Sequence, residues 1–137
     1  MLNDVLNRLR SKVKDVDVED ALEMAQALQR QRESKRNTLY VVPDAEAPGP
    51  NRMRDGSTNQ TVTEQVMVVM AQRLRPRGED DDLEALKRAV HAALLGFTPD
   101  GYKEPLSYAG GNLINLDDGA VWYGLRYETE TRLESTS

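Results

Sequence analysis

Two segments with the composition of β-strands are longer than the domain that a chain of 137 residues can form. The segment 60–74 carries apolar side chains on both of its faces between Val62 and Ala71, which predicts a central strand covered on both sides. Fully extended, this segment would span ~50 Å and the segment 120–132 ~43 Å, at ~3.3 Å per residue. A compact sphere of this chain length has a diameter of only ~37 Å. Such strands must bend, as Gly124 would allow, fray beyond a bulge, or project from the domain and pack against another molecule.

The remaining elements follow from hydrophobic periodicity and from capping and turn residues. Apolar side chains at helical spacing predict helices over 2–13, 17–28 and 79–95. The second begins at Asp17, and its expected buried stripe is Ala21, Leu22, Ala25 and Leu28. Runs of β-forming residues predict further strands over 38–42, 104–108 and 112–116. A turn at 117–119 joins the last of these to the segment 120–132.

Prolines and glycines mark the connections between these elements, which together form one domain. Pro43 is expected to end the strand over 38–42 and to begin a long flexible loop over 43–59. Gly110-Gly111 is expected to turn the chain, and residues 134–137 are expected to form a frayed C-terminus. The resulting order predicts a single α+β domain over residues 1–137. We expect two layers, in which a mostly antiparallel sheet of about four to five strands packs with about three helices.

Composition excludes several classes of function. The chain has no Cys and one His, which excludes disulfides, thiolate zinc sites, cysteine nucleophiles and paired-histidine metal centres. The net charge of −5 disfavours tight binding to DNA or RNA. Residues 1–78 hold 13 Lys/Arg against 11 Asp/Glu, and residues 79–137 hold 5 against 12. This uneven distribution of charge either aligns neighbouring copies head to tail or simply belongs to a solvated surface. No segment has the apolar length of a membrane span or of a secretory signal, so we expect folding in a reducing cytoplasm.

Three features could carry chemistry, and each also has a structural explanation. His91 would need a nucleophile and an orienting carboxylate to act as a general base, and nothing in the sequence singles out a serine for that role. The acidic run 79–82 spreads around a helix start and complements the helix dipole, so it does not converge on a metal ion. Gly110-Gly111 lacks the motif of a phosphate-binding loop. We therefore expect no catalytic, cofactor-binding or metal-binding residues.

Other residues are candidates for contact with a partner. Arg73, Arg75 and Arg77 alternate along the chain, which places three guanidinium groups on one strand face. These guanidinium groups contact either phosphate or an acidic patch on a neighbouring molecule, or else they lie in water. Trp122 lies on the otherwise polar face of the last predicted strand, and exposed tryptophan is enriched at interfaces. The hypothesis that follows is that the long strands carry subunit contacts.

These pieces, taken in order, resemble the tail terminator proteins of long-tailed bacteriophages and the neighbouring tail-completion proteins of the head–tail joint. The resemblance rests on Val41-Val42-Pro43, Gly49-Pro50-Asn51, Gln60, Val62, Glu64, Val68-Val69, Leu94-Leu95-Gly96-Phe97 with Pro99, Gly110-Gly111, the run 116–119, Trp122 and Tyr127. It covers residues 1–133. Phe97 stands where Trp is expected, and the two N-terminal helices match in pattern alone.

The resemblance implies a structural protein with no catalytic residues and no cofactor. Such proteins assemble as a hexameric ring that caps the head-proximal end of the tail tube, stops its polymerisation and offers a joining surface to the head. The implied partners are further copies of the chain, the tail tube protein and a neck or head-completion protein, with DNA passing through the lumen. The implied location is the virion tail, after assembly in the host cytoplasm.

The expected interface residues come from the long strands and from the predicted loop. They are Trp122, Tyr123, Arg126, Arg73, Arg75, Arg77, Pro48, Pro50, Arg52 and Arg54. Two alternatives remain at this point. One is a neck or head-closure protein of the same virion, and the other is a small cytoplasmic enzyme or binding module with the 43–59 loop over a pocket that contains His91.

Overall fold

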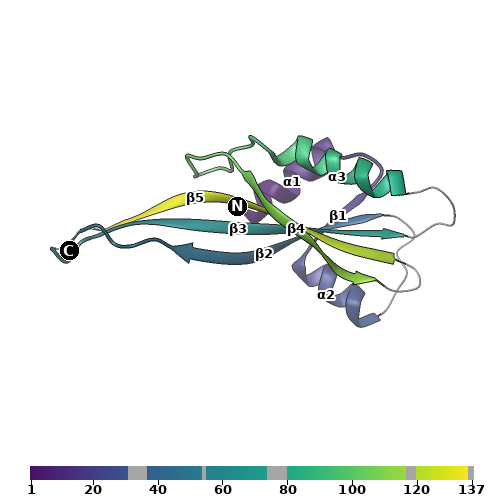
Figure 1. Cartoon of the computed structure of the whole chain (residues 1–137), viewed down its shortest axis with the longest axis horizontal. Coiled ribbons are helices and arrows are strands. Elements are labelled where there is room, and N and C mark those ends of the chain that lie inside the picture. The colour runs from purple at the N-terminus through teal and green to yellow at the C-terminus, as the bar shows by residue number, and fades with distance from the viewer. Residues whose placement is uncertain (31–36, 54, 74–79, 117–119, 136–137) are drawn as a thin grey trace.

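The chain forms a five-stranded sheet with helices on both faces (Figure 1). The computed structural model describes residues 1–30, 37–53, 55–73, 80–116 and 120–135. In chain order the elements are α1 (Leu2–Lys12), β1 (Asp17–Asp20), α2 (Ala21–Arg30), β2 (Thr38–Pro48), β3 (Thr58–Arg73), α3 (Asp80–Leu94), β4 (Ser107–Leu116) and β5 (Ala120–Ser135). The strands lie in the order β1-β2-β3-β5-β4, with β1 parallel to β2 and every other pair antiparallel. The predicted α+β class, the three helices and the mostly antiparallel sheet are confirmed.

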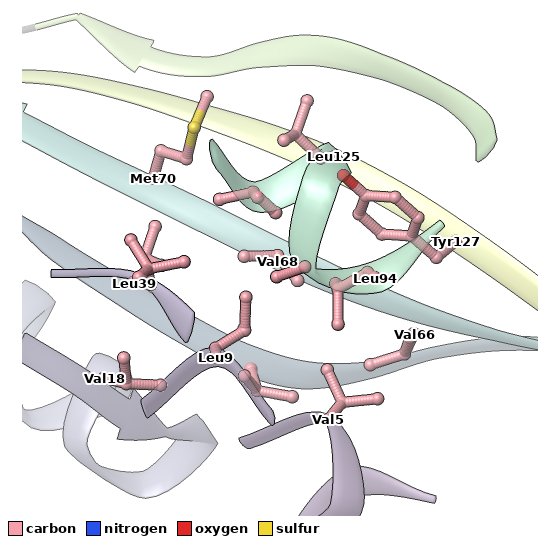
Figure 2. Close-up of a cluster of buried hydrophobic side chains, with 14 of the residues drawn as sticks. Val5, Leu9, Val18, Leu39, Val66, Val68, Met70, Leu94, Leu125 and Tyr127 are labelled. Carbon is pink, nitrogen blue, oxygen red and sulfur yellow. The ribbon is translucent and has the colours of Figure 1, made fainter. Parts of the chain in front are cut away.

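The larger core lies between one face of the sheet and helices α1 and α3 (Figure 2). Its fully buried members are Val5, Leu9, Leu39, Val66, Val68, Met70, Val90, Leu94, Leu125 and Tyr127. In β3 and β5 these are alternate residues, because successive side chains of a strand point to opposite faces. Polar contacts join the two helices, since Arg8 of α1 donates from Nε to the carbonyl oxygen of Ala93 in α3 at 3.0 Å.

A smaller core on the opposite face corrects the two-layer prediction. The other set of β3 side chains, Val69 and Ala71, packs there with Tyr40 and Trp122 under the half-buried Met24 and Ala27 of α2. Figure 1 shows α2 on the side of the sheet opposite to α1 and α3. The central strands are therefore covered on both faces near the helices, as the apolar residues on both faces of β3 predict.

The start of the second predicted helix is wrong. Residues Asp17–Asp20 form β1, which pairs with Thr38–Val41, and Arg10 of α1 donates to the carbonyl oxygen of Val18 at 2.9 Å. Asp20, rather than Asp17, caps α2, because its carboxylate accepts the backbone N–H of Glu23 at 2.9 Å. The expected buried stripe of α2 is wrong as well, since Leu22 and Leu28 are exposed.

The strand that was expected to end at Pro43 continues to Pro48. β2 pairs with β3 from Thr38 to Pro48, with an irregular register between Pro43 and Glu46. β1 pairs with β2 only as far as Val41, so beyond that point β2 is an edge strand. Proline is tolerated at edges and bulges because no sheet neighbour there needs its missing N–H.

Gly110-Gly111 lies inside β4 and does not turn the chain. The register with β5 shifts between Tyr108 and Gly110, and Gly110 has a φ of 118°, which favours glycine at this bulge. Gly111 is packed so closely that a Cβ atom there would lie 2.9 Å from the carbonyl oxygen of Gly124. The weak strand predicted over 104–108 therefore begins at Ser107 and runs through both glycines to Leu116.

The sheet extends well beyond the helices as a long projection, visible at the left of Figure 1. β3 and β5 have 16 residues each and stay paired from Arg73↔Ala120 to Thr58↔Ser135. Residues 44–53, 55–64 and 129–135 make up this projection, which we call the arm. The expectation of a frayed end over 134–137 is corrected for Glu134 and Ser135, which pair with β3. Residues 136–137 lie outside the described residues.

Candidate assembly surfaces

The arm has the exposure of a contact surface rather than of a core. Among its described residues Val62 is the one buried hydrophobic side chain, whereas Met53 and Leu133 are exposed. Strand pairing alone does not bury apolar area, so the arm contributes little to the hydrophobic stability of the subunit. Its shape and exposure suit contact with another molecule.

Hydrogen bonds of Asn51 organise the tip of the arm. The side-chain oxygen of Asn51 accepts the backbone N–H groups of Met53 (3.2 Å) and Asn59 (2.9 Å), and its amide donates to the carbonyl oxygen of Ser57 (3.1 Å). The backbone N–H of Gly49 donates to the carbonyl oxygen of Thr61 at 2.7 Å. The long loop predicted over 43–59 is thus reduced to the connection 49–57.

Three predicted interface residues lie together at this tip. Pro48 ends β2, and Pro50 and Arg52 follow it in the connection, all with exposed side chains. The backbone N–H of Arg52 donates to the carbonyl oxygen of Asn59 at 3.1 Å, which fixes the chain while the guanidinium stays at the surface. Arg54 lies outside the described residues.

An acidic hollow of about 510 Å³ lies at the base of the arm. It is lined by Met1, Leu2, Asn3, Pro43, Asp44, Glu46, Glu64, Gln65 and Tyr102. The hydroxyl of Tyr102 donates to the carboxylate of Glu64. Burial, this hydrogen bond and the nearby carboxylates raise the pKa of Tyr102 to about 12. The hollow therefore contains three carboxylates, of which Asp44 is paired with Arg126.

Arg126 is engaged within the subunit. Its Nε atom lies 3.1 Å from the carboxylate of Asp44 on β2, and its guanidinium also donates to the side chain of Asn112 on β4. Arg126 belongs to β5, so these contacts connect three strands of the sheet. Its side chain remains partly exposed.

Trp122 does not have the exposure that the sequence suggests. Only 7% of its surface is exposed, and its ring stacks on Tyr40 with centroids 5.7 Å apart and planes inclined by 7°. Trp122 belongs to the smaller core with Tyr40, Val69 and Ala71, so it stabilises the subunit from inside. Tyr123 is half-buried on the other face, where the Lys87 ammonium lies 5.6 Å from its ring centroid.

The predicted row of arginines lies at the end of β3. Arg73 is the last residue of that strand and pairs with Ala120 of β5. Its side chain, and the whole of Arg75 and Arg77, lie outside the described residues.

Strand β4 forms an apolar edge that the sequence analysis missed. It is the last strand of the sheet, and its ten residues include no charged side chain. Leu113 and Leu116 are 52% and 59% exposed, and Tyr108 and Ile114 are exposed as well. The signal in the sequence was the lack of charged residues and prolines over 107–116. Natural edge strands generally carry such residues, which prevent pairing with other chains.

A groove of about 240 Å³ lies at the opposite edge of the sheet, between α1 and α2. Its lining comprises Leu2, Asn3 and Leu6 of α1, Asp20, Ala21 and Leu22 at the start of α2, and Val41 and Pro43 of β2. Leu22 is 64% exposed, the most exposed large hydrophobic side chain of the described residues. We call this feature the α1–α2 groove.

His91 packs among aromatic rings. Its Nδ1 atom is hydrogen-bonded to the Tyr127 hydroxyl at 2.7 Å, and its ring meets Tyr108 edge-on with centroids 4.6 Å apart. Its ring contacts among the described residues are with the phenol side chains of Tyr108 and Tyr127 rather than with a nucleophile and an orienting carboxylate. Burial and the nearby Lys87 ammonium lower the pKa of His91.

This lowered pKa predicts the pH dependence of stability. An unfolded chain binds a proton at His91 near pH 6.5, whereas the folded chain binds it only at lower pH. The free energy of unfolding should therefore decrease as the pH falls through this range and level off below the folded pKa. Urea titrations between pH 8 and pH 5 should show this decrease in the parent protein, and the His91→Gln variant should show a flatter profile. Equal pH profiles for the two proteins would contradict the assignment.

The described residues lack two other kinds of site. Among residues 1–30, 37–53, 55–73, 80–116 and 120–135, no helix is long and apolar enough to cross a membrane. In the same part of the chain, no three side chains of His, Asp or Glu lie close enough together to hold a metal ion.

Comparison with known proteins identifies the family. The family described as phage tail terminator protein matches residues 2–137. No curated protein matches the chain in sequence. Members of this family are structural components of the phage tail that act at the tail tube and are not enzymes. The match favours the terminator interpretation over both alternatives, the neck protein and the small enzyme. The chain belongs to the phage tail terminator protein family.

Proposed function

We propose that copies of this chain form a ring, expected to be a hexamer, on the head-proximal end of the tail tube. The ring stops polymerisation of the tube and presents a surface to a neck or head-completion protein, and DNA passes through its lumen. The observation that carries this proposal is the arm, which projects from the sheet and exposes most of its surface. A terminator must bind the tube on one side and a different protein on the other, so it needs contact surfaces outside its core.

The distribution of charge supports a passage for DNA. The net charge is −5, and the hollow at the arm base is lined by Asp44, Glu46 and Glu64. A tightly bound duplex requires a basic surface that neutralises phosphates. An acidic protein instead lets DNA move through the lumen without holding it.

The remaining interface assignments are part of this proposal. Pro48, Pro50, Arg52 and Arg54 at the arm tip would contact the tube or the neck protein. Arg73, Arg75 and Arg77, together with Tyr123 and Arg126, would contribute to contacts between copies. Arginine suits such contacts because its planar guanidinium binds carboxylates in a bidentate manner.

Electron microscopy of tails tests the proposal. Tails from a phage that lacks this protein should carry tubes that extend beyond the normal length and should not join heads, because the growing end stays open. Purified protein added during tail assembly should restore uniform length and should appear as a ring of density at the head-proximal end. Density at the opposite end, or normal joining without the protein, would contradict the proposal.

A further inference from the structure

The two edges of the sheet differ in how they are protected. At one edge, β1 has the sequence Asp17-Val18-Glu19-Asp20, and the free edge of β2 carries Pro43 and Pro48. Charges and prolines are the features that keep edge strands from pairing with other chains. At the other edge, β4 has no charge and exposes four large hydrophobic side chains. An exposed apolar edge of this kind marks an interaction site.

The α1–α2 groove offers a complementary surface at the protected edge. Most of its lining is apolar, from Leu2 and Leu6 on one side to Leu22 on the other. The exposed apolar side chains of β4 point to both faces of the sheet: Leu113 lies opposite Tyr123, and Ile114 lies over Gly124 on the other face. The groove also has walls on both faces, because α1 and α2 cover opposite sides of the sheet.

We propose that β4 of one subunit docks into the α1–α2 groove of the next subunit and so makes the contact that repeats around the ring. This inference rests on the ring of the proposed function and names the surfaces that close it. A ring requires a heterologous contact, in which two different patches of the same chain meet. β4 and the groove lie at opposite edges of the sheet, so each subunit offers one patch to each neighbour.

Two other arrangements are less compatible with these surfaces. Contact between β4 and β4 of another copy would be isologous, and it would close pairs of subunits instead of a ring. Addition of β4 as a further strand along β2 is hindered because Pro43 and Pro48 lack an N–H group. Docking of side chains from β4 into the groove avoids both difficulties.

Cysteine cross-linking tests the contact without background disulfides, because the chain has no native cysteine. The double variant Leu22→Cys/Leu113→Cys should form disulfides between subunits when oxidised. Non-reducing gels should then show a ladder of covalent multimers, both for the concentrated free protein and for protein bound to tails. The two positions of one subunit cannot react with each other. Four strand spacings of ~4.8 Å separate the edges, whereas a disulfide requires Cα atoms within ~7 Å.

The single variants serve as controls. Leu22→Cys alone and Leu113→Cys alone should remain monomeric on the gel. A disulfide dimer of Leu113→Cys alone would show a β4–β4 contact and would overturn the proposal. A double variant that gives no ladder in either setting would overturn it as well.

Charge substitutions provide an independent measurement. Leu113→Asp removes one half of the contact and Leu22→Asp the other, so each variant alone should lose assembly while its thermal melting stays near that of the parent. In an equimolar mixture, the unchanged β4 of the Leu22→Asp variant can still dock into the unchanged groove of the Leu113→Asp variant. Since no second contact is possible, light scattering should show dimers and nothing larger. Leu95→Asp, at an exposed leucine outside both surfaces, should assemble normally. Assembly by either single variant, or no dimers in the mixture, would contradict the contact.

The outcomes separate this inference from the function on which it rests. Tails that are capped normally by protein that forms no ladder would refute the contact and leave the function intact. A ladder from protein that does not cap tails would support the contact and refute the function.

Discussion

Ending the chain after Glu130 is expected to abolish rescue of a terminator-defective phage while the rest of the subunit folds. The truncation removes the part of β5 that pairs with Thr58–Val62 in the arm. None of the residues in the two hydrophobic cores lies beyond residue 130. The midpoint of thermal unfolding should therefore fall by less than about 5 °C, the shift that ~1 kcal/mol produces in a domain of this size. Plaque counts after expression of the variant should equal those obtained with no protein.

A shorter truncation after Ser135 is the matched control for this experiment. It leaves all of β5 in place and should rescue the phage fully. If the chain ending at Glu130 also restored normal plaque numbers, the arm would be dispensable and the proposed function would lose its main support.

Replacing Trp122 with alanine should destabilise the subunit by about 3–5 kcal/mol, the usual cost of removing a large buried aromatic side chain. Trp122 stacks on Tyr40 in the smaller core, so its loss leaves a cavity there. Urea unfolding monitored by far-ultraviolet circular dichroism measures this loss. Trp122→Phe retains an aromatic ring over Tyr40 and should lose much less stability.

The same variant distinguishes burial from a role in assembly. An exposed interface tryptophan could be removed with little effect on the stability of the free subunit. A Trp122→Ala protein that unfolds at the parent concentration of urea, and fails only to assemble, would therefore contradict the buried position.

Elements with strong local signals were predictable from the sequence. Apolar residues on both faces of 60–74 predicted the central strand β3, and the turn at 117–119 predicted the pairing of β4 with β5. The alternation along the last strand also placed Trp122 on the face opposite to its apolar residues, and the structure has Tyr123, Leu125 and Tyr127 on that other face. In each case the periodicity of the segment itself determines which side chains are buried.

Elements that depend on distant partners were not predictable in the same way. Asp17–Asp20 has the composition of a helix start and becomes a strand because it pairs with Thr38–Val41. Pro43 lies within a strand because that strand is at an edge there. Trp122 is buried in the smaller core, to which α2 contributes Met24 and Ala27 rather than Leu22 and Leu28. Pairing and coverage are tertiary properties that a local pattern does not encode.

The assembly surfaces were partly predictable. The strand lengths left bending, fraying and projection open, and the arm shows that the strands project from the domain. The apolar edge of β4 was missed because Gly110-Gly111 suggested a turn and divided the segment into two short pieces. The α1–α2 groove was missed because it forms from three segments of the chain that meet only in the folded protein.

The position of β5 has a consequence for how the protein is made. This strand is last in the chain but lies between β3 and β4 in the sheet, and it supplies residues to both hydrophobic cores. A nascent chain that has not yet released residues 120–135 from the ribosome therefore has neither core complete and lacks the strand that pairs with β3 along the whole arm. Contacts between residues so far apart in sequence form late. Fragments from interrupted translation thus lack the complete cores that hold the assembly surfaces in place.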